Sequence, residues 1–134
     1  MATMTIGKLA QAGGVGVETV RYYQRRGLLP QPERPGGFGS GGGVRRYDEV
    51  DLRRLRFIRS AQGAGFTLEQ IGELLRLDAT EDRPQARALA RKCLDDLDRR
   101  IADLQAARTW LSRLEHECAS RERGPCPILQ AFDA

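Results

Sequence analysis

The 134-residue chain is poor in several residue types on which enzymes depend. It contains three cysteines, one histidine and one tryptophan, and aromatic residues make up only 6% of the sequence. We find no nucleophile–base pairing, phosphate-binding loop or histidine-rich stretch, so the sequence predicts a protein that is not an enzyme. Three cysteines are also fewer than the four that an iron–sulfur cluster requires in one chain.

Long apolar runs are absent as well. No segment approaches the roughly 20 apolar residues of a membrane span, and residues 1–11 lack the apolar centre of a secretory signal. We therefore expect a cytoplasmic protein that has no membrane partner. Because that compartment keeps thiols reduced unless they bind metal or perform redox chemistry, a disulfide between Cys118 and Cys126 is disfavoured.

Positive charge is present, and its placement is uneven. The chain has 22 basic and 18 acidic side chains, a net charge of +4, and the N-terminal half holds a cluster of ten arginines: Arg21, Arg25, Arg26, Arg34, Arg45, Arg46, Arg53, Arg54, Arg56 and Arg59. Guanidinium groups suit phosphate and base-edge contacts, although a GC-rich genome would enrich arginine equally.

The first 47 residues have the pattern of a helix-turn-helix motif followed by a hairpin. Apolar spacing predicts two short helices within about residues 6–25, with Thr5 as the first cap and glycines in residues 13–16 at the turn. Residues 29–47 then read as a wing whose glycine-rich tip spans residues 36–43.

A second helix pair follows over residues 48–77. Asp48 is placed to cap a helix over about residues 48–63, and Thr67 with Gln70 has the form of a capping box before another. Residues 1–77 are therefore expected to form one DNA-binding domain.

The region from 78 to 117 is expected to be a linker and one long helix. Residues 84–117 contain no glycine, and alternating steps of four and three connect the positions of an apolar seam: Ala90, Leu94, Leu97, Ile101, Leu104, Arg108 and Leu111. Such a stripe cannot be buried by one helix alone. The sequence therefore predicts an antiparallel coiled coil in a homodimer, with Cys93 as a small apolar residue at its seam.

Residues 118–134 are expected to form a loop and a short final helix. Pro127 suits the first helical position, which leaves Cys126 at the cap, where the helix dipole favours its thiolate. The turn-prone residues between Cys118 and Cys126 would let both sulfurs converge on a soft metal ion. The alternative is two unrelated reduced cysteines.

These stretches together resemble one known family. MTIGKLAQAGGVGVETVRYYQRRGLL, VRRYDEVDLRRLRFIRSAQGAGFTLEQIGELLRL and the terminal C…CPIL are similar to the MerR family of metal-responsive transcription regulators. The stretches YQRRGLL and RFIRSAQ look most like its mercury-responsive branch. The resemblance implies a winged helix-turn-helix at each end of an antiparallel coiled-coil dimer. It also implies that effector binding distorts operator DNA and activates a metal-resistance promoter for RNA polymerase.

The resemblance also implies which residues contact DNA. The recognition helix would be residues 17–26, and the DNA contacts would come from this helix and from the wing: Thr19, Arg21, Tyr22, Tyr23, Arg45, Arg46 and Tyr47. Arginine forks and tyrosine hydroxyls suit the phosphate backbone. Whichever of Tyr22 and Tyr23 faces inward would instead belong to the core.

For the metal, the resemblance implies Hg(II) bound by Cys118 and Cys126. Mercury sensors of the family add a cysteine from the start of the partner's long helix, where this chain has Asp82 or Arg83. Asp82 and His116 are the candidate extra ligands for an ion that takes more than two. The two-thiol loop is also similar to that of Cu(I), Ag(I) and Au(I) sensors. Zn(II) fits less well because it takes about four ligands.

Two further kinds of protein can be compared with a metal sensor. A small-molecule-responsive regulator of the same family would carry a larger C-terminal domain, for which residues 118–134 leave no room. An architectural DNA-bending protein without an effector would fit the same sequence if both cysteines were inert.

Overall fold

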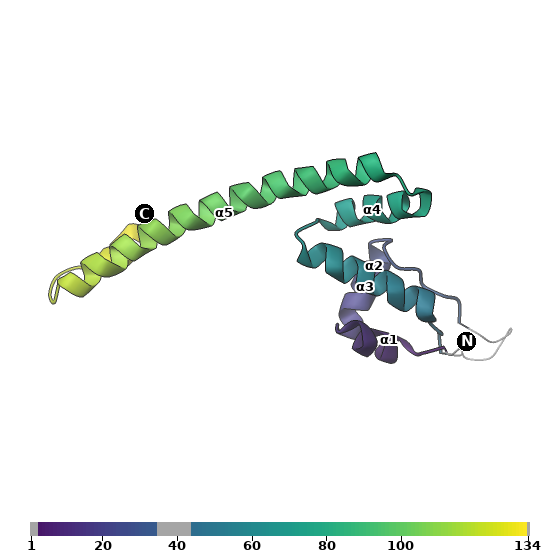
Figure 1. The fold of residues 1–134 in the computed structure, drawn as a ribbon. Helices are drawn as coiled ribbons and strands as arrows, with labels where there is room; N and C mark the ends of the chain where they lie inside the picture. The colour runs from purple at the N-terminus through teal and green to yellow at the C-terminus, as the bar shows by residue number, and fades with distance from the viewer. Residues whose placement is uncertain (1–2, 35–43, 134) are drawn as a thin grey trace. The chain divides into compact units, whose positions relative to one another are not determined.

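The computed structural model describes residues 3–34 and 44–133, and all regular structure in that part of the chain is helical. Its six helices are α1 (Ile6–Gly13), α2 (Val17–Arg25), α3 (Glu49–Gly63), α4 (Leu68–Thr80), α5 (Arg83–Ser120) and α6 (Pro127–Phe132) (Figure 1). The predicted all-α fold is confirmed. None of these helices combines the length and the apolar character of a membrane span.

The expected wing contributes little strand structure. An isolated antiparallel bridge joins Met4 to Tyr47, with backbone N–O distances of 2.7 and 2.8 Å, and no other strand pairing occurs in the described residues. The glycine-rich tip expected over residues 36–43 lies outside the described residues.

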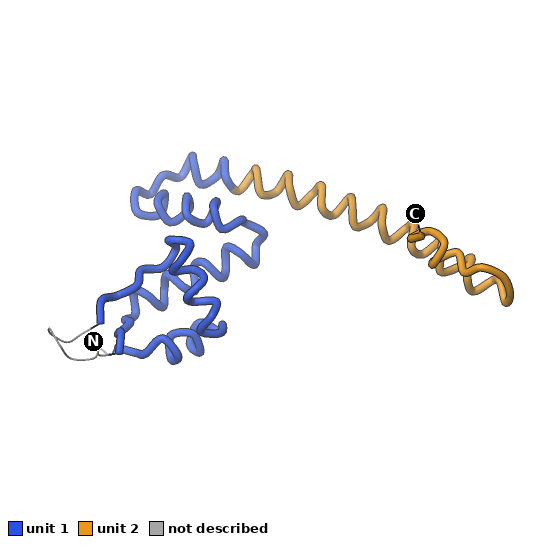
Figure 2. The backbone as a smooth tube through the Cα atoms, turned by 180° about the vertical axis from the view of Figure 1, so that it is seen from behind, with its two compact units in different colours: residues 1–89 blue, residues 90–134 orange. Residues whose placement is uncertain are grey.

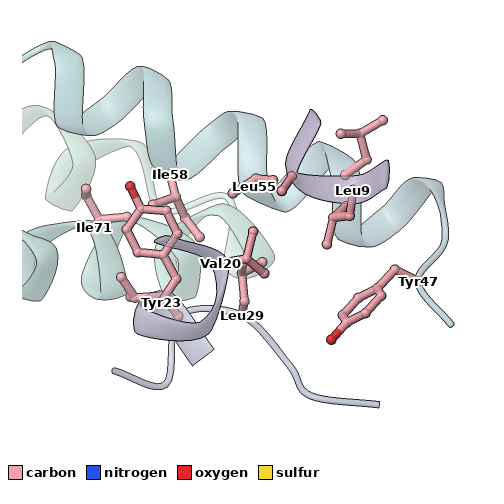
Figure 3. Packing of buried hydrophobic residues seen from close by; sticks show 11 residues of the cluster. Leu9, Val20, Tyr23, Leu29, Tyr47, Leu55, Ile58 and Ile71 are labelled. Carbon is pink, nitrogen blue, oxygen red and sulfur yellow. The ribbon is translucent and has the colours of Figure 1, made fainter. Parts of the chain in front are cut away.

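The chain divides into two compact units, Met1–Leu89 and Ala90–Ala134, and α5 contributes to both (Figure 2). The first unit has a single apolar core, in which five side chains are fully buried: Leu9, Val20, Leu55, Ile58 and Ile71 (Figure 3). Full burial of such a side chain stabilises the fold by roughly 1.5–3 kcal/mol. The core therefore fixes how α1 to α4 pack together.

Three helices of the first unit, α1, α3 and α4, begin at the predicted caps. The Thr5 hydroxyl accepts a hydrogen bond from the Lys8 backbone N–H. Asp48 and Thr67 each form a capping box with the residue three positions later, Asp51 and Gln70. Each cap satisfies backbone donors that the first helical turn leaves without a partner.

The turn of the helix-turn-helix depends on two glycines. Gly14 caps α1 in the left-handed region, with φ of 72°, and its backbone N–H bonds back to α1. A Cβ atom on Gly13 would overlap the Leu55 side chain, so the close approach of α1 and α3 requires glycine there.

The junction between α4 and α5 is shorter than the expected linker. α4 continues to Thr80, beyond the expected end near residue 77, because no glycine or proline interrupts residues 73–80. Only Glu81 and Asp82 separate the two helices, and Glu81 adopts a left-handed conformation with φ of 53°. The long helix likewise runs from Arg83 to Ser120, three residues beyond its expected end.

Candidate nucleic-acid interface and candidate metal site

The solvent-facing side of α2 carries a cationic cluster built on Tyr22. The guanidinium carbons of Arg25 and Arg26 lie 5.8 and 6.0 Å from the centre of the Tyr22 ring, and the ring is 39% exposed. Arg21 is also exposed, and its Nη1 donates to Glu18 Oε1 at 3.1 Å. Since an exposed pair of this kind contributes less than about 1 kcal/mol, Arg21 can exchange Glu18 for a phosphate at little cost.

Tyr23, one residue further along α2, lies in the core and corrects one predicted DNA contact. Its side chain is 4% exposed, and its hydroxyl donates to Gln62 Oε1 on α3 at 2.6 Å. Burial raises the pKa of Tyr23, and the charge of Arg59 opposes that shift. Tyr23 follows Val20 by three residues and therefore shares its inward face, so it supports the interface from beneath.

Tyr47 is a second correction of the same kind. Its side chain is 2% exposed, and its hydroxyl accepts a hydrogen bond from Gln24 Nε2 at 2.9 Å. Because the Met4–Tyr47 bridge fixes its backbone, the ring turns into the core beside α1 and α2. Tyr47 therefore anchors the wing to α2 and presents no ring to solvent.

The arms of the wing are bonded to each other and to α2. Gln24 Nε2 also donates to the Pro30 carbonyl at 3.2 Å, and Arg45 Nε donates to the Pro32 carbonyl at 2.9 Å. These bonds hold residues 30–32 and 45–47 close to the exposed side of α2. Arg46 is exposed, whereas Thr19 and Arg45 are half-buried.

A hollow of about 330 Å³ lies between α2 and the wing. Its lining residues come from α1, α2 and both wing arms: Ile6, Arg21, Gln24, Gln31, Arg34, Val44, Arg45 and Tyr47. Three of them are arginines, which makes the hollow a suitable seat for an anionic group such as a backbone phosphate. The sequence reasoning missed Gln24 and Arg34 as site residues, although Gln24 lies three positions after Arg21 on the same helix face.

The C-terminal unit brings Cys118 and Cys126 together. Their Sγ atoms are 3.4 Å apart, which is a thiol–thiol contact and far longer than the roughly 2.05 Å of a disulfide bond. Cys118 lies in the last turn of α5, and Cys126 is the N-cap of α6 with Pro127 at its start, as predicted. Gly124, with φ of 102°, lets the loop between them reverse direction.

The surroundings of the two sulfurs push their pKa values apart. The pKa of Cys126 is lowered by the backbone N–H of Leu129, by its hydrogen bond with Cys118 and by the backbone N–H of Ile128. The pKa of Cys118 is raised by the hydrogen bond to Cys126, by burial and by the negative charges of Cys126 and Glu115. Cys126 is thus the first to become a thiolate, with Cys118 as its S–H donor.

The separation of the sulfurs suits a bridging metal ion. Two metal–sulfur bonds of about 2.3 Å place their sulfurs about 3.8 Å apart at a tetrahedral angle and about 4.6 Å apart in a straight line. The observed 3.4 Å is close to the first value and shorter than the second.

The candidate extra ligands do not join this pair within one chain. Asp82 Oδ1 accepts from the Gln85 backbone N–H at 3.2 Å and caps the start of α5, whereas Cys118 is at the other end of that helix. His116 is exposed and two residues before Cys118, so it points away from it. No cluster of three or more His, Cys, Asp or Glu residues occurs among residues 3–34 and 44–133.

Comparison with known proteins identifies close relatives over nearly the whole chain. Residues 4–78 match the model described as "MerR HTH family regulatory protein", and residues 52–114 match "MerR, DNA binding". The chain is 44% identical to the mercuric resistance operon regulatory protein of Serratia marcescens over 133 residues, which cover 98% of this chain and 89% of that protein.

Two further relatives show how far the similarity extends. The HTH-type transcriptional regulator ZntR of Escherichia coli is 36% identical over 133 residues, with 96% of this chain and 91% of that protein covered. The crystal structure of the transcription regulator PbrR691 from Ralstonia metallidurans CH34 in complex with lead(II) superposes with a TM-score of 0.70 at 35% identity. It covers 96% of this chain and 98% of that one.

Proposed function

The chain belongs to the MerR family of helix-turn-helix regulatory proteins, and on that premise we propose that it is a metal-responsive transcription regulator. In this proposal Cys118 and Cys126 bind a soft, thiophilic metal ion, and the N-terminal unit binds operator DNA. The single observation that carries the proposal is the 3.4 Å contact between two sulfurs that are eight positions apart in the sequence.

Exposed and half-buried residues of α2 and of the wing are proposed to make the DNA contacts. Arg21, Arg45 and Arg46 supply guanidinium groups for phosphate oxygens, and Thr19 and the exposed Tyr22 complete the set on α2. Tyr23 and Tyr47 act behind this surface through Gln62 and Gln24. Operator binding by this face is consistent with the match of residues 4–78, which contain it, to the helix-turn-helix model of the family.

Hg(II) is the metal that we propose first. The named mercury regulator is the relative with 44% identity, and two thiolates are ligands that soft ions prefer. Cu(I), Ag(I) or Au(I) would suit the same pair of thiols, and lead(II) is bound by a structural relative. Zn(II) ranks lower because the two sulfurs would need further ligands, for which Asp82 or His116 of a partner subunit is the nearest source by residue type.

In this proposal the two cysteines bind the ion and α5 connects them to the DNA-binding unit. Cys126 ionises first and Cys118 second, so the site releases protons as it takes up the metal, and the bound ion then fixes the loop 121–126 to the end of α5. α5 is one uninterrupted helix from Arg83 to Ser120. We propose that it transmits the change at the thiols to the DNA-binding unit, which distorts the operator so that RNA polymerase can use the promoter.

Self-association belongs to the same proposal. Along α5 the seam residues Leu94, Ile101, Leu104 and Leu111 are 58, 51, 70 and 48% exposed. Apolar positions repeated in this way are buried when two such helices pair, and we propose an antiparallel homodimer. No catalytic step is part of this function.

A metal titration of the reduced protein tests the proposal. Hg(II), Cu(I) and Zn(II) are added to the wild type and to the Cys118→Ser, Cys126→Ser and Cys93→Ser variants, and thiolate–metal absorption is followed. We expect tight Hg(II) or Cu(I) binding that either loop substitution abolishes and that Cys93→Ser preserves. Binding that survives Cys118→Ser would reject the site, and operator binding without any metal binding would favour the architectural alternative.

A further inference from the structure

α6 is too short to be held in place by its own hydrogen bonds. It has six residues, and its N-cap is Cys126, whose thiol is a weak hydrogen-bond acceptor. Isolated helices below about 12–15 residues are marginal in water. The position of Cys126, and with it the distance between the two sulfurs, must therefore depend on contacts that α6 makes with another element.

One such contact is between two aromatic rings. Trp110 on α5 and Phe132, the last residue of α6, pack edge to face, with ring centres 5.3 Å apart and planes at 89°. This is the geometry that the charge distribution of aromatic rings favours. Figures 1 and 2 both show α6 turned back along the last turns of α5, so the contact closes the far end of this short helix.

The ring contact and the thiol contact lie at opposite ends of α6. Cys126 stands at its N-cap and Phe132 at its final position. On α5 their partners Trp110 and Cys118 flank Leu114 in steps of four residues, which follow one ridge of a helix surface. Leu114 is half-buried although its neighbours Arg113 and Glu115 are exposed, as expected for a residue beneath a packed helix.

We propose that Trp110 and Phe132 are positioning residues of the metal site. Their contact holds α6 against α5 and so presents Cys126 to Cys118 before any ion arrives. Without it, the loop 121–125, which turns at Gly124, gives Cys126 a wide range of positions. This inference rests on the proposed function for the use of the thiol pair, but the positioning itself can be measured without metal.

The metal-independent measurement is the effective concentration of the two thiols. In a glutathione buffer, Cys118 and Cys126 form one disulfide while one oxidised glutathione accepts their two electrons and two protons and becomes two reduced molecules. Mass spectrometry of the peptides reports the fraction oxidised. We expect Phe132→Ala and Trp110→Ala to lower the effective concentration about 10-fold. Trp110→Phe, which keeps an aromatic ring, should restore most of it.

Leu129→Ala is the matched control. Leu129 is also an apolar residue of α6, but its side chain is 71% exposed. It acts on Cys126 through its backbone N–H, which the substitution by alanine keeps. We expect it to leave the thiol equilibrium unchanged. Circular dichroism of each variant confirms that α5 is retained. Wild-type behaviour of Phe132→Ala, or an equal loss in Leu129→Ala, would overturn the positioning role.

Hg(II) affinity, measured against a competing dithiol, provides the second readout. Loss of residues that orient a metal ligand typically costs 10- to 100-fold in affinity, so Phe132→Ala should weaken Hg(II) binding by at least about 10-fold. Wild-type Hg(II) affinity in Phe132→Ala, combined with abolished binding in Cys118→Ser, would reject this inference and keep the proposed function. If Phe132→Ala changes the thiol equilibrium but Hg(II) still binds Cys118→Ser, the positioning role is kept and the proposed function is rejected.

Discussion

The two units of the chain differ in how much apolar surface they bury by themselves. In residues 3–89, α1 to α4 enclose a continuous core that extends from Leu9 to Ile71. In residues 90–133, only Cys93 and Pro127 are buried, while four apolar seam residues of α5 remain exposed: Leu94, Ile101, Leu104 and Leu111. The first unit is therefore stabilised from within, and the second depends on what it binds.

This contrast follows from the arrangement of the helices. Four short amphipathic helices can turn their apolar faces toward one another, and the caps at Thr5, Asp48 and Thr67 fix where three of them start. A single helix of 38 residues has an apolar stripe but no neighbour long enough to cover it. A sensor gains from this division, because the part that must respond is the part with least internal stability.

The largest effect is expected from Leu55→Ala in the first unit. Leu55 is fully buried and packs against Gly13, so its truncation leaves a cavity where α1 meets α3. We expect the free energy of unfolding to fall by about 3–4 kcal/mol. Urea denaturation measures this loss. Val50→Ala on the same helix is the control, because Val50 is 68% exposed and should change stability by less than about 0.5 kcal/mol.

The contrast between the two units would be contradicted if Leu55→Ala lowered the free energy of unfolding no more than Val50→Ala does. A loss that disappeared at high protein concentration would contradict it as well, because the core of the first unit is intramolecular.

A smaller effect, and a different dependence on concentration, is expected from Leu104→Ala in α5. Leu104 is 70% exposed in the single chain, so its truncation removes little internal packing. If two copies of α5 pair, each loses a buried leucine. We expect dimerisation to weaken by about 2 kcal/mol, or roughly 30-fold in dissociation constant. Analytical ultracentrifugation measures that constant.

Gln105→Ala provides the matched control beside it. Gln105 is exposed and lies off the seam, so the dissociation constant should not change. If Leu104→Ala and Gln105→Ala had the same dissociation constant, the apolar seam of α5 would not be the dimer interface.

The smallest effect is expected from Arg21→Ala on α2. Loss of one phosphate contact per subunit should weaken DNA binding by about 1 kcal/mol and lower the dependence of log affinity on log salt by about one, each counted per subunit of the dimer. Fluorescence anisotropy with a duplex that the protein selects from a random pool measures both. An unchanged salt dependence would remove Arg21 from the interface.

Tyr23→Phe tests whether Tyr23 stabilises the core and does not contact DNA, in contrast to Arg21 on the same helix. It removes the hydroxyl that donates to Gln62, so we expect a loss of about 1 kcal/mol in the free energy of unfolding. The salt dependence of DNA binding should remain that of the wild type. A changed salt dependence would return Tyr23 to the DNA-contacting set.

Local chemistry explains which parts of the fold could be predicted from the sequence. The caps at Thr5, Asp48 and Thr67 and the helix start at Pro127 are set by residues within four positions, and all four appear as expected. The end of α4 was misplaced because no residue near position 77 stops a helix. Its end depends on the left-handed Glu81, which no local signal marked.

Prediction of the site residues from the sequence was limited in the same way. The pairing of Cys118 with Cys126 was predicted because the loop between them is short. The choice between Tyr22 and Tyr23 was left open, since only the packing of α2 on α3 decides which ring is buried. Tyr47 and Gln24 were misjudged or missed because their bond joins residues 23 positions apart. Contacts at that separation are created by the fold and leave no local pattern.

The most direct test of the account is the reactivity of operator DNA with and without Hg(II). The wild type, Cys118→Ser and Cys126→Ser are each bound to the selected duplex, and permanganate reactivity of thymines at its centre is measured. We predict that Hg(II) changes this reactivity only when both thiols are present, while all three proteins bind the duplex equally without metal. The same change in either serine variant, or none in a wild type that has bound Hg(II), would contradict the claim that the thiol pair controls the DNA.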